Sequence, residues 1–168
     1  MQPIFEENGI RVREITAADD AALAGIIRAN LEKAHLDIPG TAYFDATLDH
    51  LSRFYLSAPT KRAYLVAETA DGQILGGVGL AEFEGMDDCA ELQKLYLSDA
   101  VKGHGLGKRL MQLITDRAKA LGYRSLYLET HTNLTTAIRL YERFDFRPLP
   151  RSASAVHSTM NCFFIKEL

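Results

Sequence analysis

Cysteine is scarce in this sequence, and the spacing of its two cysteines excludes the common cysteine-based sites. Cys89 and Cys162 stand far apart among 168 residues, with no CxxC pair and no Cys/His cluster at zinc spacing. We therefore expect no metal site. We interpret both cysteines as free thiols that pack in the interior of a protein from a reducing compartment.

Long apolar runs and an excess of positive charge are also missing. No apolar stretch approaches the roughly 20 residues that a membrane-spanning helix needs. Residues 1–9 contain no basic segment followed by an apolar run, so no signal peptide is indicated. The formal net charge is -3, which argues against non-specific nucleic-acid binding. These absences predict a cytoplasmic protein that binds neither membranes nor nucleic acids.

The composition is that of a soluble globular protein. Hydrophobic residues make up 47% and charged residues 24% of the chain. A chain of 168 residues is long enough to bury a substantial core without disulfides. We therefore expect one domain over residues 1–168.

Hydrophobic periodicity predicts the element order β-α-α-β-β-β-α-β-α-β. Strands are predicted at residues 10–15, 62–68, 74–83, 90–97, 125–130 and 160–166. The first helix is predicted to start at Thr16, with a capping box to Asp19. Further helices are predicted at residues 47–56, 106–121 and 133–144, and Asn133 is the predicted N-cap of the last. This order predicts an α/β (α+β) fold in which a mixed sheet is flanked by helices.

The most informative segment is a glycine-rich turn between the strand at 90–97 and the helix at 106–121. It reads KGHGLGK over residues 102–108. The first turn of a helix has unpaired N–H groups and positive potential, and glycines let the backbone approach a phosphate closely. The segment therefore indicates a pyrophosphate site made mainly of main-chain donors, supplemented by Lys102, Lys108 and Arg109.

Other interpretations of the same turn remain open. Glycines also serve where the chain only needs a tight turn. An unrelated nucleotide-binding module is a further alternative, but the spacing fits neither the Rossmann pattern G-x-G-x-x-G nor the Walker pattern G-x-x-x-x-G-K-[ST].

Two motifs resemble those of the GCN5-related N-acetyltransferase (GNAT) superfamily. The first motif of the family consists of Arg or Gln, any two residues, Gly, any one residue, and Gly or Ala. Residues 102–107 match it, with Lys102 in place of Arg or Gln. The family's Asn…Ala-x-x-Leu-Tyr-x-x-x-Gly-Phe is matched by Asn133 and residues 137–146, with Asp145 in place of Gly. The resemblance covers about residues 10–146 and implies a mostly antiparallel sheet.

The resemblance implies acetyl-CoA as cosubstrate and assigns the residues that bind it. The strand at 92–97 would splay from its neighbour and pair with the pantetheine arm through its main chain, with the Leu95 N–H aimed at the thioester carbonyl. The implied cofactor-binding residues are Leu95, Tyr96, Leu97, Gly103, His104, Gly105, Leu106, Gly107, Lys108 and Asn133.

Tyr141 and Glu91 are the predicted catalytic residues. Tyr141 matches the family position of the acid that protonates the CoA thiolate, and Glu91 opens the central strand, where several relatives place a base. Alternatively, Tyr141 only packs in the interior and Glu91 is a solvated carboxylate at the end of a strand. Other candidate bases are Glu129, His131 and His157, and a water chain without a single base is a further alternative.

The predicted partner is an amine-bearing small molecule or peptide. Its site is expected in the loop at residues 34–48, where aromatic rings and carboxylates suit an amine. The residues concerned are Asp37, Tyr43, Phe44 and Asp45. A non-catalytic CoA or acyl-CoA sensor of the same fold is the alternative function. The resemblance also allows a homodimer.

Overall fold

The computed structural model describes residues 2–150 and 159–168 and contains an eight-stranded sheet of order β1-β2-β3-β4-β5-β6-β8-β7. The strands are β1 (Phe5–Glu7), β2 (Ile10–Glu14), β3 (Ala63–Thr69), β4 (Ile74–Glu82), β5 (Cys89–Leu97), β6 (Ser125–Thr130), β7 (Arg147–Pro148) and β8 (Cys162–Glu167). The helices are α1 (Asp20–Lys33), α2 (Leu51–Leu56), α3 (Leu106–Ala120) and α4 (Thr135–Arg143), with short 3₁₀ turns at Ala17–Asp19, Ala42–Phe44, Leu48–His50 and Asp99–Val101.

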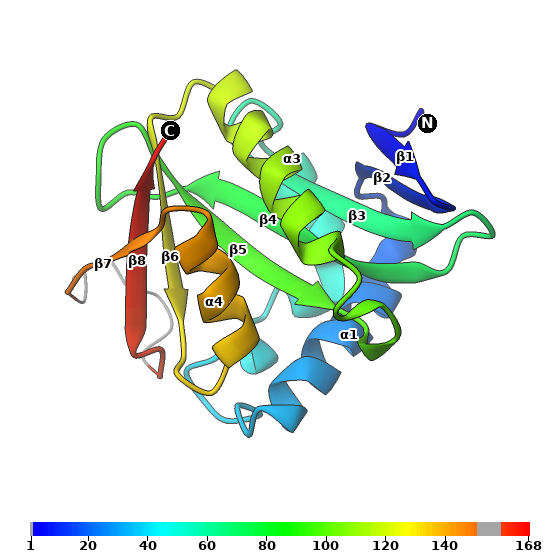
Figure 1. The fold of residues 1–168 in the computed structure, drawn as a ribbon, viewed down its shortest axis with the longest axis horizontal. Helices are drawn as coiled ribbons and strands as arrows, with labels where there is room; N and C mark the ends of the chain where they lie inside the picture. Colours follow the sequence, from blue (N-terminus) through cyan, green and yellow to red (C-terminus); the bar gives the residue numbers. More distant parts are fainter. Residues whose placement is uncertain (1, 151–158) are drawn as a thin grey trace.

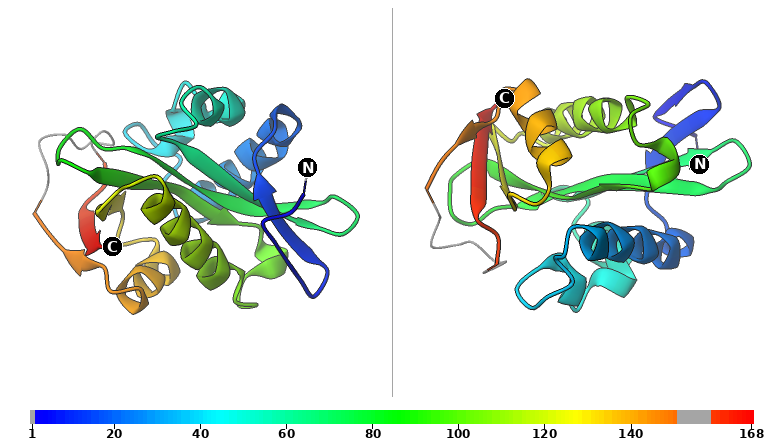
Figure 2. Two further views of the ribbon diagram at one scale, coloured as in Figure 1. Left: turned by 90° about the horizontal axis from the view of Figure 1, so that it is seen from above. Right: turned by 60° about the horizontal axis from the view of Figure 1, so that its bottom comes forward.

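All neighbouring strands run antiparallel except β5 and β6, which are parallel. Helices α3 and α4 cover one face of the sheet, and α1 and α2 cover the other (Figures 1 and 2). The predicted mixed, mostly antiparallel sheet flanked by helices is therefore confirmed. The short strands β1 and β7 at the two edges were not predicted.

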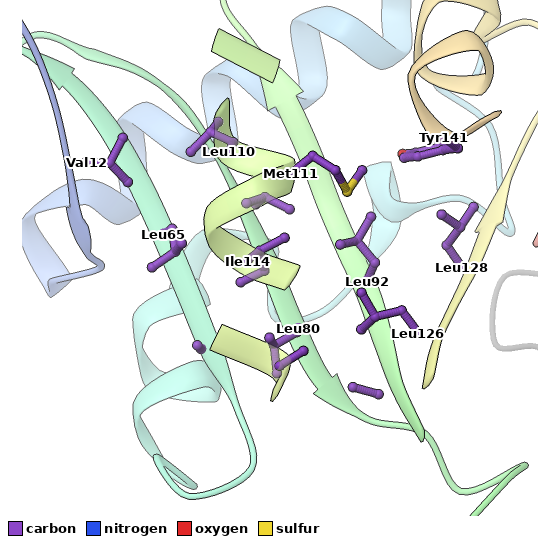
Figure 3. Close-up of a cluster of buried hydrophobic side chains, with 14 of the residues drawn as sticks. Val12, Leu65, Leu80, Leu92, Leu110, Met111, Ile114, Leu126, Leu128 and Tyr141 are labelled. Atoms are coloured by element: carbon purple, nitrogen blue, oxygen red, sulfur yellow. The ribbon is translucent and has the colours of Figure 1, made fainter. Parts of the chain in front are cut away.

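Each face of the sheet carries its own apolar core. On the face of α3, Leu110, Met111 and Ile114 pack against the sheet residues Leu80 and Leu92 (Figure 3). On the face of α1 and α2, the buried side chains include Ile27, Leu31, Leu51, Tyr55, Tyr64 and Val66. The helical spacing of the apolar residues and the alternation in the strands account for both layers.

The capping box predicted at Thr16 is present, at the start of the 3₁₀ turn that leads into α1, whereas the predicted N-cap of the last helix is wrong. The main-chain N–H of Thr16 donates to the Asp19 carboxylate at 2.7 Å, as a capping box requires. Helix α4 begins at Thr135 with Leu134 as its N-cap, and the Asn133 side chain instead donates to the Ala34 carbonyl at 2.8 Å. The Asn133 side chain thus bonds to a carbonyl that is distant in the sequence and does not cap the nearby helix.

Neither cysteine is disulfide-bonded: Cys89 is buried and Cys162 is half-buried. Within residues 2–150 and 159–168, no helix combines the length and the apolar character that a bilayer crossing requires.

Glycines of β4 give a direct test of the packing on the α1 face. A Cβ at Gly77 would lie 2.5 Å from both the Leu65 carbonyl oxygen and the Tyr64 ring. We expect Gly77→Ala to lower the free energy of unfolding by about 2 kcal/mol or more, because the backbone of β3 must shift. In the exposed helix position Gly25, where an added Cβ meets nothing within 4 Å, Gly25→Ala should instead raise stability by about 1 kcal/mol. Urea unfolding of both variants measures the two signs, and a stable Gly77→Ala protein would contradict the packing.

Candidate active site

The middle of the sheet splits between β5 and β6. The two strands pair only at Cys89↔Ser125, Ala90↔Leu126 and Glu91↔Tyr127. Beyond Glu91 they diverge, and Figure 1 shows α4 lying on the sheet face beside the opening. The main-chain edge of β5 from Leu92 to Leu97 therefore has no strand partner on the β6 side among the described residues. This is the splaying that the resemblance implied.

A β-bulge interrupts β5 at the same place. On the edge of β5 that faces β4, Gly77 pairs with Tyr96 and Gly79 pairs with Gln93. Between these two pairs β5 therefore has one more residue than β4. Lys94 takes the left-handed conformation, with φ 50°. Nothing in the sequence signalled this bulge, because lysine is not a residue that favours positive φ.

The glycine-rich turn leads from β5 into α3. Gly103 and Gly105 have φ of 82° and 79°, and Gly105 is the N-cap of α3 without a side-chain cap. A Cβ at either position would meet nothing within 4 Å, so open space lies beside the turn. The glycines are thus required for the backbone conformation, and they leave one side of the turn uncovered.

Most main-chain N–H groups of this turn are unpaired. The His104 N–H donates to the Val101 carbonyl at 3.4 Å. No described residue accepts a hydrogen bond from the main-chain nitrogens of Gly103, Gly105, Leu106, Gly107 and Lys108. Unpaired donors at the N-terminus of a long helix, beside open space, are the arrangement that binds a phosphate group.

The lysine that opens the motif turns away from these donors. Lys102 Nζ lies 2.6 Å from Asn30 Oδ1 and 2.9 Å from Asp99 Oδ1. Burial lowers the pKa of Lys102. Asn30 also donates to the Leu97 carbonyl at 2.8 Å, so this asparagine of α1 ties the end of β5 to the start of the turn.

Tyr141 projects from α4 toward the opening. It is 6% exposed, and its ring centroid lies 5.9 Å from that of Phe146 and 6.4 Å from that of Phe164. Figure 3 shows its hydroxyl directed toward β5. Burial raises the pKa of Tyr141, so the phenol stays protonated at neutral pH, and no described residue hydrogen-bonds the hydroxyl. A protonated phenol at this position can donate a proton to a group in the opening.

Glu91 approaches the opening from the other face of the sheet. Ala90 and Leu92 pack in the α3 core, and alternation therefore directs Glu91 toward the α1 and α2 side. Glu91 is buried, with 7% exposure, and stands between Ala81 of β4 and Tyr127 of β6 in the sheet register. The structure thus places the two predicted catalytic residues on opposite sides of one split.

The alternative bases differ in their surroundings. Glu129 accepts a hydrogen bond from the Tyr127 hydroxyl at 2.8 Å. His131 accepts one at Nδ1 from the Asn133 N–H at 3.0 Å, which places the proton of the neutral ring on Nε2 and leaves no free acceptor nitrogen. His157 lies outside the described residues.

The loop predicted to receive the acceptor contacts the bulge. Asp45 pairs with Lys94 at 3.1 Å, and the Tyr43 hydroxyl donates to Glu32 at 2.7 Å. Phe44 is 60% exposed, and Asp37 is exposed as well. Lys94 was not among the predicted site residues, because its role follows from the irregular strand and not from a motif.

Comparison with known proteins agrees with this geometry. A sequence profile of the Acetyltransferase (GNAT) family matches residues 15–146. The chain belongs to this family. YjgM, an uncharacterized N-acetyltransferase of Escherichia coli strain K12, is 37% identical over 137 residues, which are 80% of each chain. The predicted acyltransferase activity, an N-acetyltransferase, is thereby confirmed.

More distant relatives extend the comparison. An L-methionine sulfoximine/L-methionine sulfone acetyltransferase of Pseudomonas paraeruginosa is 30% identical over 55% of this chain and 56% of its own. A GNAT acetyltransferase of Staphylococcus aureus Mu50 has the same fold, with a TM-score of 0.82 at 19% identity over 95% of this chain and 99% of its own. YncA of Salmonella typhimurium, solved with acetyl-CoA, has a TM-score of 0.73 at 20% identity over 96% and 95% of the two chains.

The turn assignment is tested by filling the space beside its donors. We expect Gly105→Leu to weaken acetyl-CoA binding roughly 100-fold, because the side chain occupies the phosphate position and φ must change. Gly122→Leu is the matched control, since Gly122 also has positive φ (89°) and open space around it but lies at the other end of α3. Titration calorimetry measures both affinities, and equal losses in the two variants would contradict the assignment.

Proposed function

We propose that this chain transfers the acetyl group of acetyl-CoA to a primary amine by direct attack within a ternary complex, in a single domain over residues 1–168. The observation that supports this most directly is the set of N–H groups at residues 103 and 105–108, which no described residue pairs, next to the edge of β5 that no described strand pairs. In this proposal the turn binds the pyrophosphate, and the edge from Leu95 to Leu97 binds the pantetheine arm.

Acetyl-CoA is the cosubstrate that these residues fit. The turn offers main-chain donors to a diphosphate, and the exposed strand edge offers both donors and acceptors to an amide-bearing arm. YncA and a phosphinothricin acetyltransferase of Sinorhizobium meliloti, both of the same fold, were solved with acetyl-CoA. Gly107 supports the fit in another way: Leu97 and Leu140 side chains pack within 3.6 Å of where its Cβ would stand, so α3 and β5 meet closely.

Each reacting group has a proposed partner in the chain. The Leu95 N–H donates to the thioester oxygen as negative charge develops there. The amine nitrogen forms the new bond to the acetyl carbon, and the carbon–sulfur bond breaks. Tyr141 donates its proton to the departing sulfur. A thiol is more acidic in water than a phenol, so we expect the transfer to occur while the carbon–sulfur bond is breaking and negative charge builds up on the sulfur. The phenol regains a proton afterwards.

Glu91 is proposed to take the proton that the amine loses. Its carboxylate faces the α1 and α2 side, where the acceptor loop contacts β5, while Tyr141 faces the α3 and α4 side. The acceptor and the leaving thiol then occupy opposite faces of the split, which prevents the acid and the base from neutralising each other directly.

The acceptor is proposed to be a small molecule or peptide with a primary amine. The relative from Pseudomonas paraeruginosa acts on amino acid analogues by its name, which makes free amino acids a first class to test. A thiol-release assay with amino acids, polyamines, aminoglycosides and peptides identifies the class. Acetyl-CoA binding without thiol release in any of them would favour the sensor alternative. Analytical ultracentrifugation measures whether the chain forms the homodimer that the resemblance allows.

The role of Tyr141 predicts a separation of binding from turnover. Tyr141→Phe should lower kcat roughly 100-fold, because the departing sulfur loses its proton donor, while acetyl-CoA affinity changes little. Steady-state kinetics and calorimetry measure the two quantities. Loss of affinity and turnover by the same factor would make Tyr141 a binding residue only.

The assignment of the base is tested by comparing the buried Glu91 with the half-buried Glu129. Glu91→Gln should lower kcat/KM for the amine roughly 100-fold at neutral pH, because the isosteric amide does not accept the proton. Glu129→Gln, which keeps the same shape on the neighbouring strand, should have a far smaller effect. If the two effects are reversed, Glu129 is the base.

A further inference from the structure

We propose that Tyr64, a residue of β3, is a positioning residue that fixes the Lys94–Leu95 peptide and thereby aims the Leu95 N–H at the thioester oxygen. The inference rests on the proposed acetyl transfer and adds to it a residue that lies two strands away from the opening. No sequence motif marks this tyrosine.

The Tyr64 side chain reaches across β4 to β5. Its hydroxyl donates to the Lys94 carbonyl oxygen at 3.0 Å, although β3 and β5 are not neighbours in the sheet. The path over β4 is open because glycines stand there: a Cβ would lie 2.5 Å from the Tyr64 ring at Gly77 and 2.7 Å from it at Gly79. The missing side chains of β4 are thus what lets a phenol contact the bulge.

A contact to this carbonyl sets the direction of the next N–H. The Lys94 carbonyl and the Leu95 N–H belong to one peptide group, which is planar and trans, so they point in opposite directions. A hydrogen bond that holds the oxygen toward β3 therefore holds the N–H away from β3. That direction leads to the unpaired edge of β5, where the thioester is proposed to lie.

This peptide needs an anchor more than its neighbours do. Lys94 and Leu95 have no register partner on β4, and among the described residues β5 has none on β6 beyond Glu91. The left-handed conformation of Lys94, with φ 50°, is strained for a residue other than glycine. Sheet pairing therefore does not fix the plane of the peptide, and side-chain contacts must do so.

The environment of Tyr64 suits a constant donor. The side chain is 1% exposed and its ring packs 5.0 Å from that of Tyr55, whose own hydroxyl donates to Gln93 Oε1 at 2.8 Å. Burial raises the pKa of Tyr64, so the phenol stays protonated throughout the physiological range. Donation to the carbonyl also polarises the peptide, which strengthens the N–H on its other side as a donor.

The test is the variant Tyr64→Phe in the full chain. Removing one hydroxyl leaves the ring and its packing in place but frees the Lys94–Leu95 peptide to rotate. We expect kcat to fall about tenfold, because a misdirected oxyanion donor loses much of its effect, while KM for acetyl-CoA stays close to that of the wild type. An unchanged kcat would overturn the proposal.

Tyr123→Phe is the matched control. The Tyr123 hydroxyl also donates to a main-chain carbonyl, that of Lys61 at 2.8 Å, but it does so far from the opening. We expect this variant to keep its kcat, and urea unfolding measures how much stability each variant loses. An equal fall of kcat in both variants would show that Tyr64 has only a structural role. Replacement of Tyr64 by 4-aminophenylalanine, which restores an N–H donor, should recover turnover, and failure to recover it would overturn the proposal.

A spectroscopic measurement separates this inference from the proposed function. With ¹³C-carbonyl acetyl-CoA and no amine, the infrared thioester band should lie at lower frequency on the wild type than in solution, since the Leu95 N–H polarises it. The band should return toward the solution value in Tyr64→Phe and not in Tyr123→Phe. A wild type that binds no acetyl-CoA would refute the proposed function, whereas a band that is shifted equally in all three proteins would refute only the role of Tyr64.

Discussion

The interruption of main-chain pairing along β5 is the feature on which the site depends. An interior strand of a sheet normally has both edges satisfied. Among the described residues, β5 loses β6 beyond Glu91, breaks register with β4 at the bulge, and leads into a turn in which most N–H groups are unpaired. In the proposed complex, the amides of a long ligand pair with the free edge of β5 and its phosphates with the N–H groups of the turn.

The sheet separates the two halves of the proposed chemistry. Tyr141 belongs to the α3 and α4 face, which also contains the turn, whereas Glu91, Asp45 and the acceptor loop belong to the α1 and α2 face. In the proposed mechanism, the buried acid and the buried base thus keep different surroundings within one small site, as proton transfer in opposite directions requires.

Glycine and tyrosine act as a pair on the α1 face. Glycines in a strand cost conformational entropy and leave no side chain to pack. In β4 that loss is offset because Tyr55 and Tyr64 occupy the space above Gly77 and Gly79 and bury their rings. Their hydroxyls then reach consecutive residues of β5, Gln93 and Lys94, so the packing of one strand fixes the irregularity of another.

Local sequence patterns predict the order of the main helices and strands, the fold class and the position of the glycine-rich turn, but not the short edge strands β1 and β7. The hydrophobic periodicity is strong in segments such as α3, and it depends only on nearby residues. The glycines of residues 102–107 indicate directly that the backbone there takes positive φ. The Asn133 cap was wrong because its side chain donates to the carbonyl of Ala34, the C-cap of α1, which is 99 residues away in the chain. Local patterns carry no information about such a contact.

Three features follow only from the arrangement of the strands in space: the bulge at Lys94, the split beyond Glu91 and the tyrosine that holds the Leu95 peptide. Each depends on which strands become neighbours and how far their registers agree, and these are sums over many distant contacts. Lysine at positive φ and a tyrosine over glycines look unremarkable in a one-dimensional pattern. They have a role because the sheet places β3, β4 and β5 side by side and leaves the Lys94–Leu95 peptide of β5 without a partner on β4.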